Sequence, residues 1–172
     1  MKGEEESLFT LFFRSKIMTD KEKSSFKTEL KDFAMAIIEE RLRFAQEAMK
    51  RAQEAANEEG KSSVGDKYEV SRAMGQIDSE MNARQLEEAN RDLVHLQNIN
   101  VAPLYNHVNE GTFVITDAQK FFFGIGLGIH KIHGDPIVFI SINSPLGKAC
   151  DGKKPGAKVN FNGKAYLIKE IW

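Results

Sequence analysis

The chain has 172 residues, enough for one or two small domains with modest hydrophobic cores. Its 24 basic and 25 acidic side chains leave a formal net charge of −1, so the sequence lacks the global positive field of a protein that binds nucleic acid unaided. The single cysteine, Cys150, excludes an internal disulfide and a cysteine-only metal site. A lone cysteine fits a reducing compartment, and we expect a cytoplasmic protein.

Residues 1–25 are expected to form a leader outside the folded domains. Three glutamates at positions 4–6 precede an apolar run at 8–13, which is too short and too acidic upstream for a signal peptide. No stretch of the sequence approaches the ~20 apolar residues of a membrane helix, so we expect no membrane partner. We expect residues 1–17 to be dispensable, with Met18 as an alternative start.

From Phe26 the sequence predicts a long amphipathic helix, because apolar residues recur at intervals of three, four or their sums. The helix is expected to end near Gly60, and its alanine-rich second half would allow a partner helix to approach closely. The predicted apolar stripe consists of Leu30, Phe33, Ile37, Phe44, Ala48 and Ala55.

A second helix is predicted from about Asp66 to Asn98, returning along the first. We therefore expect a coiled-coil hairpin over residues 26–99 with its tip at 58–69, each arm of about 33 residues extending roughly 50 Å. A hairpin can bury its apolar seam within one chain, so we expect a monomer, although the same pattern is typical of a dimerising coiled coil. The stripe on the second helix is Val70, Met74, Ile77, Met81, Leu86, Ala89, Leu93 and Leu96.

Beyond Pro103 the composition shifts to β-branched and aromatic residues. Ser144 and Pro145 predict the start of a short helix, because proline fits the first helical position. We expect residues 100–172 to form a small antiparallel sheet domain with one short helix, which makes the fold class α+β. Strands are predicted at 112–115, 121–129, 136–142, 159–161 and 165–171, with a two-residue turn at 162–163 between the last two.

The hairpin and the β-rich domain after it carry a family resemblance. Residues 144–149 (SPLGKA), followed by 152–156 (GKKPG) and a terminal strand pair, resemble the Gre-type transcription elongation factors. The resemblance covers about residues 26–172 and is strongest in the C-terminal domain, whose family fold is similar to that of FK506-binding proteins. It implies a non-enzymatic factor that binds bacterial RNA polymerase, inserts its hairpin through the secondary channel and stimulates cleavage of backtracked RNA.

The resemblance also implies a role for two acids at the tip. Residues 65–69 (GDKYE) match the Gly-Asp-x-x-Glu of the family tip, so Asp66 and Glu69 are the candidates for holding Mg²⁺ within the polymerase, beside the RNA 3′ end. Carboxylates suit this hard cation, and a two-metal arrangement stabilises the attacking and leaving oxygens of phosphodiester hydrolysis. Helix capping and a favourable helix dipole would explain the same two acids equally well.

The sequence departs from the family pattern just after these acids. The family usually follows its tip glutamate with Asn-Ala-Glu-Tyr and an arginine four residues later, whereas here Tyr68 and Arg72 have that spacing beside Asp66. Alignment on Tyr68 and Arg72 would place Glu58 and Glu59, or no acid, at the tip. That register predicts a channel-occupying regulator without cleavage, and an interaction module unrelated to polymerase is a third reading.

Basic residues at both ends of the chain are candidates for partner contacts. Those near the tip would steer RNA or polymerase phosphates, and those in the C-terminal domain would meet an acidic patch on a partner. An ordinary solvated surface explains both groups equally well. The candidates are Lys61, Lys67, Arg72, Lys148, Lys153 and Lys154.

Other constellations do not predict a site. The glycines at 124, 126 and 128 lie inside a predicted strand. They do not include the third glycine, at its proper position, of a dinucleotide-binding loop. His130 and His133 are expected on a strand-to-turn surface, and Cys150 is expected to be a buried or half-buried thiol. Prolyl isomerase activity would need an aromatic pocket that the sequence does not locate.

Overall fold

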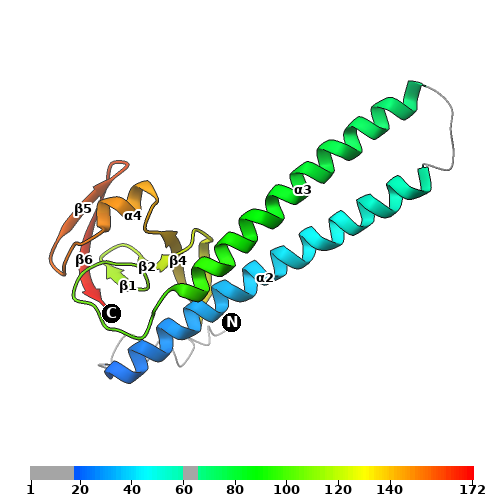
Figure 1. Cartoon of the computed structure of the whole chain (residues 1–172). Coiled ribbons are helices and arrows are strands. Elements are labelled where there is room, and N and C mark those ends of the chain that lie inside the picture. Colours follow the sequence, from blue (N-terminus) through cyan, green and yellow to red (C-terminus); the bar gives the residue numbers. More distant parts are fainter. Residues whose placement is uncertain (1–17, 60–65) are drawn as a thin grey trace, which may run out of the picture. The chain divides into compact units, whose positions relative to one another are not determined.

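The computed structural model describes the backbone of residues 18–59 and 66–172, and the side chains of residues 18–55 and 73–172. Among the described residues, two long helices, α2 (Asp20–Glu59) and α3 (Asp66–Asn98), precede the strands and one short helix (Figure 1). The chain divides into two compact units. The sheet unit combines the start of α2, up to Ala34, with Asn98–Trp172, and the hairpin unit is Met35–Gln97.

Six strands and the short helix α4 follow the two long helices. The predicted α+β fold class is confirmed: a helical hairpin precedes a mostly antiparallel sheet with one short helix. The division into folding domains of 26–99 and 100–172 stays a prediction. The elements are β1 (Phe113–Thr116), β2 (Lys120–Gly124), β3 (Gly128–Ile132), β4 (Asp135–Ser141), α4 (Pro145–Cys150), β5 (Lys158–Phe161) and β6 (Lys164–Ile171).

Helix α2 begins earlier than the sequence predicts, at Asp20 instead of Phe26. The side chains of Thr19 and Glu22 form a capping box: the backbone N–H of Thr19 donates to Glu22 Oε2 at 2.7 Å, and the N–H of Glu22 donates to Thr19 Oγ1 at 3.3 Å. The predicted leader of residues 1–25 is therefore wrong for residues 20–25, which are helical. The predictions for residues 1–17 lie outside the described residues.

The sheet has the strand order β3-β4-β2-β1-β6-β5. Its neighbouring strands pair antiparallel except β2 and β4, which are parallel and place Phe122 beside Phe139. The single strand predicted at 121–129 is wrong: β2 ends at Gly124 and β3 begins at Gly128. The intervening segment carries the chain to the far side of β4, and Gly128 adopts a φ of +82° there.

The two faces of the sheet are buried differently. On one face, Phe113, Phe122 and Phe139 form a row across β1, β2 and β4, and α2 contributes Phe26, whose ring meets that of Phe113 at 5.3 Å. Trp172 packs on the same row, with its ring 5.0 Å from that of Phe113. The start of α2 therefore covers this face of the sheet.

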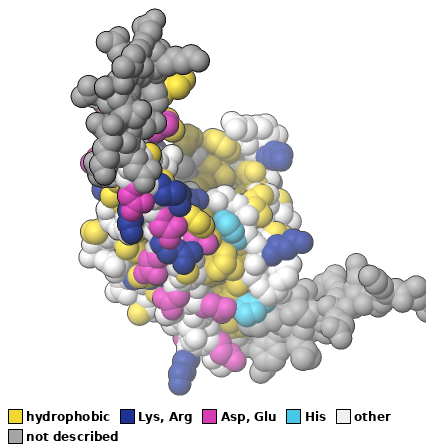
Figure 2. Space-filling view, turned by 90° about the vertical axis from the view of Figure 1, so that its right-hand side faces the viewer, with side chains coloured by type: hydrophobic (Ala, Val, Ile, Leu, Met, Phe, Trp, Pro, Cys, Tyr) yellow, Lys and Arg dark blue, Asp and Glu magenta, His cyan; other side chains and the backbone are white. Residues whose placement is uncertain are grey.

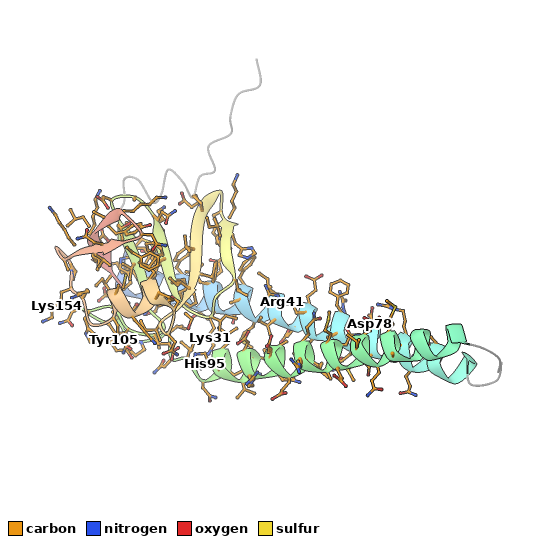
Figure 3. All side chains as sticks on the ribbon, turned by 90° about the horizontal axis from the view of Figure 1, so that it is seen from above. Lys31, Arg41, Asp78, His95, Tyr105 and Lys154 are labelled. Atoms are coloured by element: carbon orange, nitrogen blue, oxygen red, sulfur yellow. The ribbon has the colours of Figure 1, made fainter. Side chains whose placement is uncertain are left out.

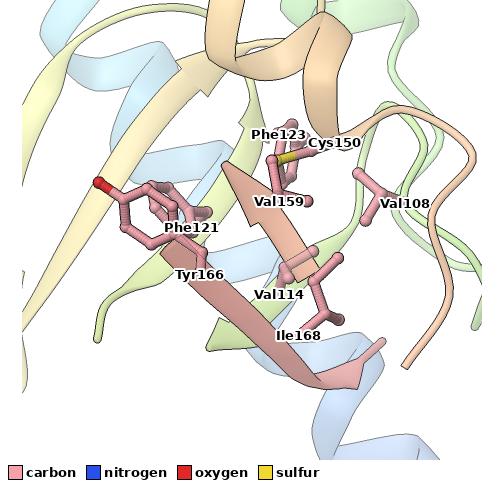
Figure 4. Packing of buried hydrophobic residues seen from close by; sticks show 8 residues of the cluster. All are labelled: Val108, Val114, Phe121, Phe123, Cys150, Val159, Tyr166 and Ile168. Carbon is pink, nitrogen blue, oxygen red and sulfur yellow. The ribbon is translucent and has the colours of Figure 1, made fainter. Parts of the chain in front are cut away.

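The opposite face carries the second part of the core, which α4 covers (Figure 4). Burial of these side chains supplies the main favourable term for folding of the sheet unit. The alternation in β2 is as the sequence predicts, since Phe121 and Phe123 lie on this face and Phe122 on the other. The cluster consists of Val108, Val114, Phe121, Phe123, Cys150, Val159, Tyr166 and Ile168.

Two local predictions in this unit are confirmed. Ser144 caps α4, because its Oγ accepts from the backbone N–H of Gly147 at 3.0 Å, and Pro145 is the first helical residue. Asn162 and Gly163 join β5 to β6 with φ values of +48° and +74°, as a type I′ turn requires. Neither described long helix has a stretch that is both apolar and long enough to cross a membrane.

Candidate functional site

The predicted tip acids lie at the start of the returning helix. Asp66 is the first residue of α3 and Glu69 lies three positions later, so both occupy its first turn. Positions three apart are neighbours on a helix surface. The side chains of Asp66, Lys67, Glu69 and Arg72 lie outside the described side chains, and Lys61 lies outside the described residues altogether.

The alternative tip register concerns the end of α2. Glu58 and Glu59 form the last two residues of that helix, and their side chains also lie outside those described. Both pairs of acids therefore flank residues 60–65, one pair on each helix. The backbone is compatible with either register, and the choice between Asp66 with Glu69 and Glu58 with Glu59 stays a prediction.

The apolar seam of the hairpin is closed at one end only. Leu96 is fully buried and Ala89 is 6% exposed, as the sequence predicts for the part of α3 far from the tip. Met74, Ile77 and Met81, which belong to the same predicted stripe, are 65%, 59% and 54% exposed. The prediction of a continuous buried seam is therefore wrong for the half of α3 nearer the tip.

Helix α2 shows the same departure at Phe44 and Ala55, which belong to the predicted stripe but are exposed. Phe44 is 55% exposed, while its neighbours Leu42 and Ala45 are buried. The buried apolar residues of α2 include Leu30, as predicted, but they follow one another at intervals of four residues up to Leu42 and then of three, which differs from the predicted stripe. They are Phe26, Leu30, Ala34, Ile38, Leu42 and Ala45.

A groove of about 510 Å³ lies between α2 and α3 within the hairpin unit. Its α2 wall carries Arg41 and Arg51, and its α3 wall carries Glu88 and Asp92. Of the exposed residues of the predicted stripe, Phe44 lines this groove, whereas Met74, Ile77 and Met81 do not. It is lined by Ile38, Arg41, Phe44, Ala45, Ala48, Arg51, Asn82, Gln85, Glu88, Ala89 and Asp92.

Charges on the hairpin are mixed in sign. Along α2, Arg51 pairs with Glu47 at 3.9 Å, and both side chains are more than half exposed. Exposed pairs of this kind contribute little stability, since water screens them. On the face shown in Figure 2, Lys and Arg side chains lie among Asp and Glu side chains. This face of the described residues therefore shows no uniform positive field for RNA.

The lysines predicted in the C-terminal domain lie on α4 and the turn after it. Lys148 lies within α4, and Lys153 and Lys154 lie between α4 and β5; all three are exposed. The backbone of this turn is fixed, because the N–H of Val108 donates to the carbonyl of Lys153 at 2.8 Å. Figure 3 shows Lys154 at the edge of the sheet unit. These side chains are available to an acidic partner surface.

A lysine cluster on α2 is a feature that the sequence reasoning missed. Lys27 is fully buried, and its Nζ donates to the carbonyl of Pro103 at 2.5 Å. The Nζ of Lys31, labelled in Figure 3, donates to the carbonyl of Ile99 at 2.8 Å. Ser24 Oγ donates to a third carbonyl of the same segment at 3.0 Å. The spacing of three and four between Ser24, Lys27 and Lys31 was visible in the sequence. Their partners are backbone carbonyl oxygens, which no pattern of side chains reveals.

Burial also changes the acidity of the Lys27 ammonium. Burial lowers the pKa of its ammonium from 10.5 to about 8, because the charged form loses water. Tyr105 lies beside it, with the ring centroid 6.0 Å from Nζ. Lys27 therefore positions the segment that joins α3 to the sheet, and it does so from inside the core.

The two histidines lie on the strand-to-turn surface that the sequence predicts. His130 belongs to β3 and packs its ring against Phe33 and Phe139 at 5.3 and 5.8 Å. His133 lies in the turn before β4, and its Nε2 is 2.5 Å from Glu29 Oε1. They contact different partners, so these two histidines do not form a metal site. No group of three His, Cys, Asp or Glu gathers around a common point among the described residues.

Comparisons with known proteins add one likeness. No protein-family model matches the chain, and no curated protein matches it in sequence. Among solved structures, the chain is similar to GreA factor homolog 1 (Gfh1) of Thermus thermophilus, at 13% identity and a TM-score of 0.32, over 84% of this chain and 93% of that one. At these values the likeness carries no functional inference, so function has to be argued from the chain's own residues.

Proposed function

We propose that this chain is a transcription elongation factor of the Gre kind, which binds bacterial RNA polymerase in the cytoplasm and brings the tip of its helical hairpin to the active centre. The observation that carries the proposal is the place of the Gly-Asp-x-x-Glu motif. Asp66 opens α3, so the two acids of the motif lie in the first turn after the connection between the long helices. A rod with carboxylates at its end suits delivery to an enclosed site.

The length of the helices supports this role. Helix α3 has 33 residues, which corresponds to about 50 Å at 1.5 Å per residue. An element of that length can carry its end deep into a channel of a large enzyme while the sheet unit stays outside. The hairpin connects to the sheet unit through α2 and the segment held by Lys27 and Lys31.

The proposed chemistry is assistance to a hydrolysis that the polymerase performs. Mg²⁺ prefers several oxygen ligands, and two carboxylates are too few to hold it tightly alone. Asp66 and Glu69 would therefore complete a site whose other ligands come from the polymerase. When bound, the ion would activate water and stabilise the oxygens of the scissile phosphodiester. The chain would then assist an enzyme, the polymerase, without being an enzyme itself.

The sheet unit would dock on the outside of the polymerase. Lys148, Lys153 and Lys154 are exposed on one short helix and the following turn, whose backbone is held by hydrogen bonds. A fixed backbone with long cationic side chains suits an acidic patch on a protein partner. We assign these lysines to polymerase contact.

The test is RNA release from a stalled, backtracked elongation complex. Wild type is compared with Asp66→Asn/Glu69→Gln, which removes both charges but leaves hydrogen-bonding groups that can still support the start of α3. The matched control is Asp78→Asn/Glu80→Gln, which removes two exposed acids from the same helix away from the tip. We expect faster release with wild type and with the control, and no stimulation with the tip variant.

The same assay separates the alternatives. Polymerase binding without faster release would identify a channel-occupying regulator and would leave Asp66 and Glu69 as helix-end residues. Absence of polymerase binding in a pull-down with purified proteins would reject the proposal and favour an interaction module of another kind. Retained stimulation by the tip variant would show that Asp66 and Glu69 do not hold the ion and would overturn their assignment.

A further inference from the structure

The open half of the hairpin seam presents apolar side chains to solvent. Phe44 on α2 and three residues of α3 are each more than half exposed. Met74, Ile77 and Met81 lie at spacings of three and four, so they share one face of α3, and a shared exposed apolar face is typical of an interaction site. The expectation of a monomer assumed that the hairpin buries its own seam, and these residues remove that reason. The three residues of α3 are Met74, Ile77 and Met81.

The exposed residues continue into the walls of the groove. On α3, Met81 is followed at spacings of four, three and four by Gln85, Glu88 and Asp92, which all line the groove. Residues at these spacings share one helix face. The α3 face is thus apolar toward the tip and acidic away from it.

The α2 wall of the groove carries the opposite charge to the α3 wall. Arg41, Phe44, Ala48 and Arg51 line the groove at spacings of three, four and three, so this face is basic with an aromatic centre. Among the described residues, no ion pair joins the arginines of one wall to Glu88 or Asp92 of the other. Apart from the exposed pair of Arg51 with Glu47 along α2 itself, the charges of both walls are therefore available to an external partner.

These charges restrict the occupant. A phosphate or nucleic acid would meet Arg41 and Arg51 but would be repelled by Glu88 and Asp92 on the opposite wall. An acidic or a basic peptide would suit one wall only. A second copy of this chain suits both, because a two-fold axis brings the basic wall of each copy against the acidic wall of the other.

We propose that the hairpin groove is a self-association surface, through which two copies of this chain form an antiparallel dimer of hairpins. Phe44 of each copy would enter the groove of the other, where Ala45, Ala48 and Ala89 leave room for an aromatic ring. The arginines of α2 would then meet the acids of α3 across the interface. The proposal concerns the chain alone and is independent of any polymerase.

The first test is sedimentation of the full chain over a concentration series, with Phe44→Ala as the variant. A central aromatic anchor typically dominates an interface of this kind, so we expect at least about a tenfold weaker dimer for the variant. Circular dichroism checks that the helices are retained. A wild-type chain that stays monomeric at every concentration would overturn the proposal.

A charge exchange gives a second test that does not depend on Phe44. Arg41→Glu/Arg51→Glu makes both walls acidic, and Glu88→Lys/Asp92→Lys makes both walls basic. Each variant alone should be monomeric through like-charge repulsion, and an equal mixture should restore the dimer as a heterodimer. Dimers of either variant alone, or no dimer on mixing, would contradict the proposed geometry.

The matched control for the charge exchange is Lys50→Glu. Lys50 is exposed on α2, pairs with Glu54 at 3.9 Å and does not line the groove. Its reversal changes net charge by the same amount per site without changing either wall. We expect its dimer affinity to match wild type within about twofold, and a loss equal to that of the arginine variant would show a nonspecific charge effect and overturn the proposal.

Discussion

The sheet unit buries most of its large apolar side chains, whereas the hairpin unit leaves several of its own exposed. In the sheet unit, Phe113, Phe122 and Phe123 are fully buried, whereas in the hairpin unit Met74 and Ile77 are more than half exposed. Stability should therefore reside mainly in the sheet unit, and the hairpin should carry surface that partners use. Binding elements are commonly drawn from the less stable parts of a fold.

The polar interactions of the two units also differ in how far they are buried. In the sheet unit, Lys27 and Lys31 donate to partly buried backbone carbonyls of the segment after α3. In the hairpin unit, pairs such as Arg43 with Glu40, at 3.7 Å, lie on the surface. Buried hydrogen bonds position a backbone, whereas exposed ion pairs contribute only tenths of a kilocalorie.

The largest predicted difference between the two units is the loss of stability when a phenylalanine of each unit is replaced by alanine. Phe122→Ala leaves a cavity in the core and should lower the free energy of unfolding by about 3–5 kcal/mol. Phe44→Ala, measured where the chain is monomeric, should change it by less than about 0.5 kcal/mol. Urea unfolding followed by fluorescence of Trp172, which packs in the sheet unit, measures both. Equal losses would contradict the contrast.

Replacing one glycine of each unit by alanine should change stability in opposite directions. A Cβ at Gly147 would lie 2.2 Å from the carbonyl oxygen of Ser141, a backbone atom that cannot easily move. Gly147→Ala should therefore destabilise the sheet unit by about 1–3 kcal/mol. Gly75 lies within α3 with nothing within 4 Å, so Gly75→Ala should stabilise that helix by about 1 kcal/mol. Thermal unfolding by circular dichroism distinguishes the two outcomes.

A third prediction uses the buried lysine of the sheet unit. The pKa of Lys27 is about 8 in the folded chain and 10.5 as its ordinary value, so the unfolded chain binds more protons between these pH values. Stability should rise with pH from about 8 to 9 in wild type relative to Lys27→Met. Unfolding by urea at several pH values measures the difference. Parallel curves for the two chains would contradict the assignment.

The smallest effect concerns the only thiol. Burial raises the pKa of Cys150 to about 11, so little thiolate forms at pH 8. We expect slow reaction of the native chain with a thiol reagent and fast reaction after denaturation. Rapid reaction of the native chain would show that this part of the core opens readily.

Where local chemistry decides the structure, the sequence was sufficient. The bounds of α3 followed from apolar periodicity, and the turn at Asn162 and Gly163 followed from residue types that favour its backbone angles. The cap at Ser144 is local in the same way. The capping box at Thr19 and Glu22 carried an equally local signal that the prediction overlooked.

Where distant contacts decide, the sequence was not sufficient. The alternation through 121–129 is compatible with one strand, and the break appears only because β4 inserts between β2 and β3. The apolar stripe that includes Phe44 and Met81 predicts a closed seam, but periodicity does not report the distance between two helices. Of the candidate site, the backbone position of Asp66 was predictable, whereas the groove between α2 and α3 was not.

The central claim is that the hairpin tip supplies carboxylates to a shared Mg²⁺ site, and the Mg²⁺ dependence of RNA release from a backtracked complex tests it most directly. With wild type, we predict stimulated release at low Mg²⁺, and with Asp66→Asn/Glu69→Gln a requirement shifted upward by about tenfold or more, as expected when ligands are lost. Identical Mg²⁺ curves for wild type and this variant, with both bound to polymerase, would contradict the claim.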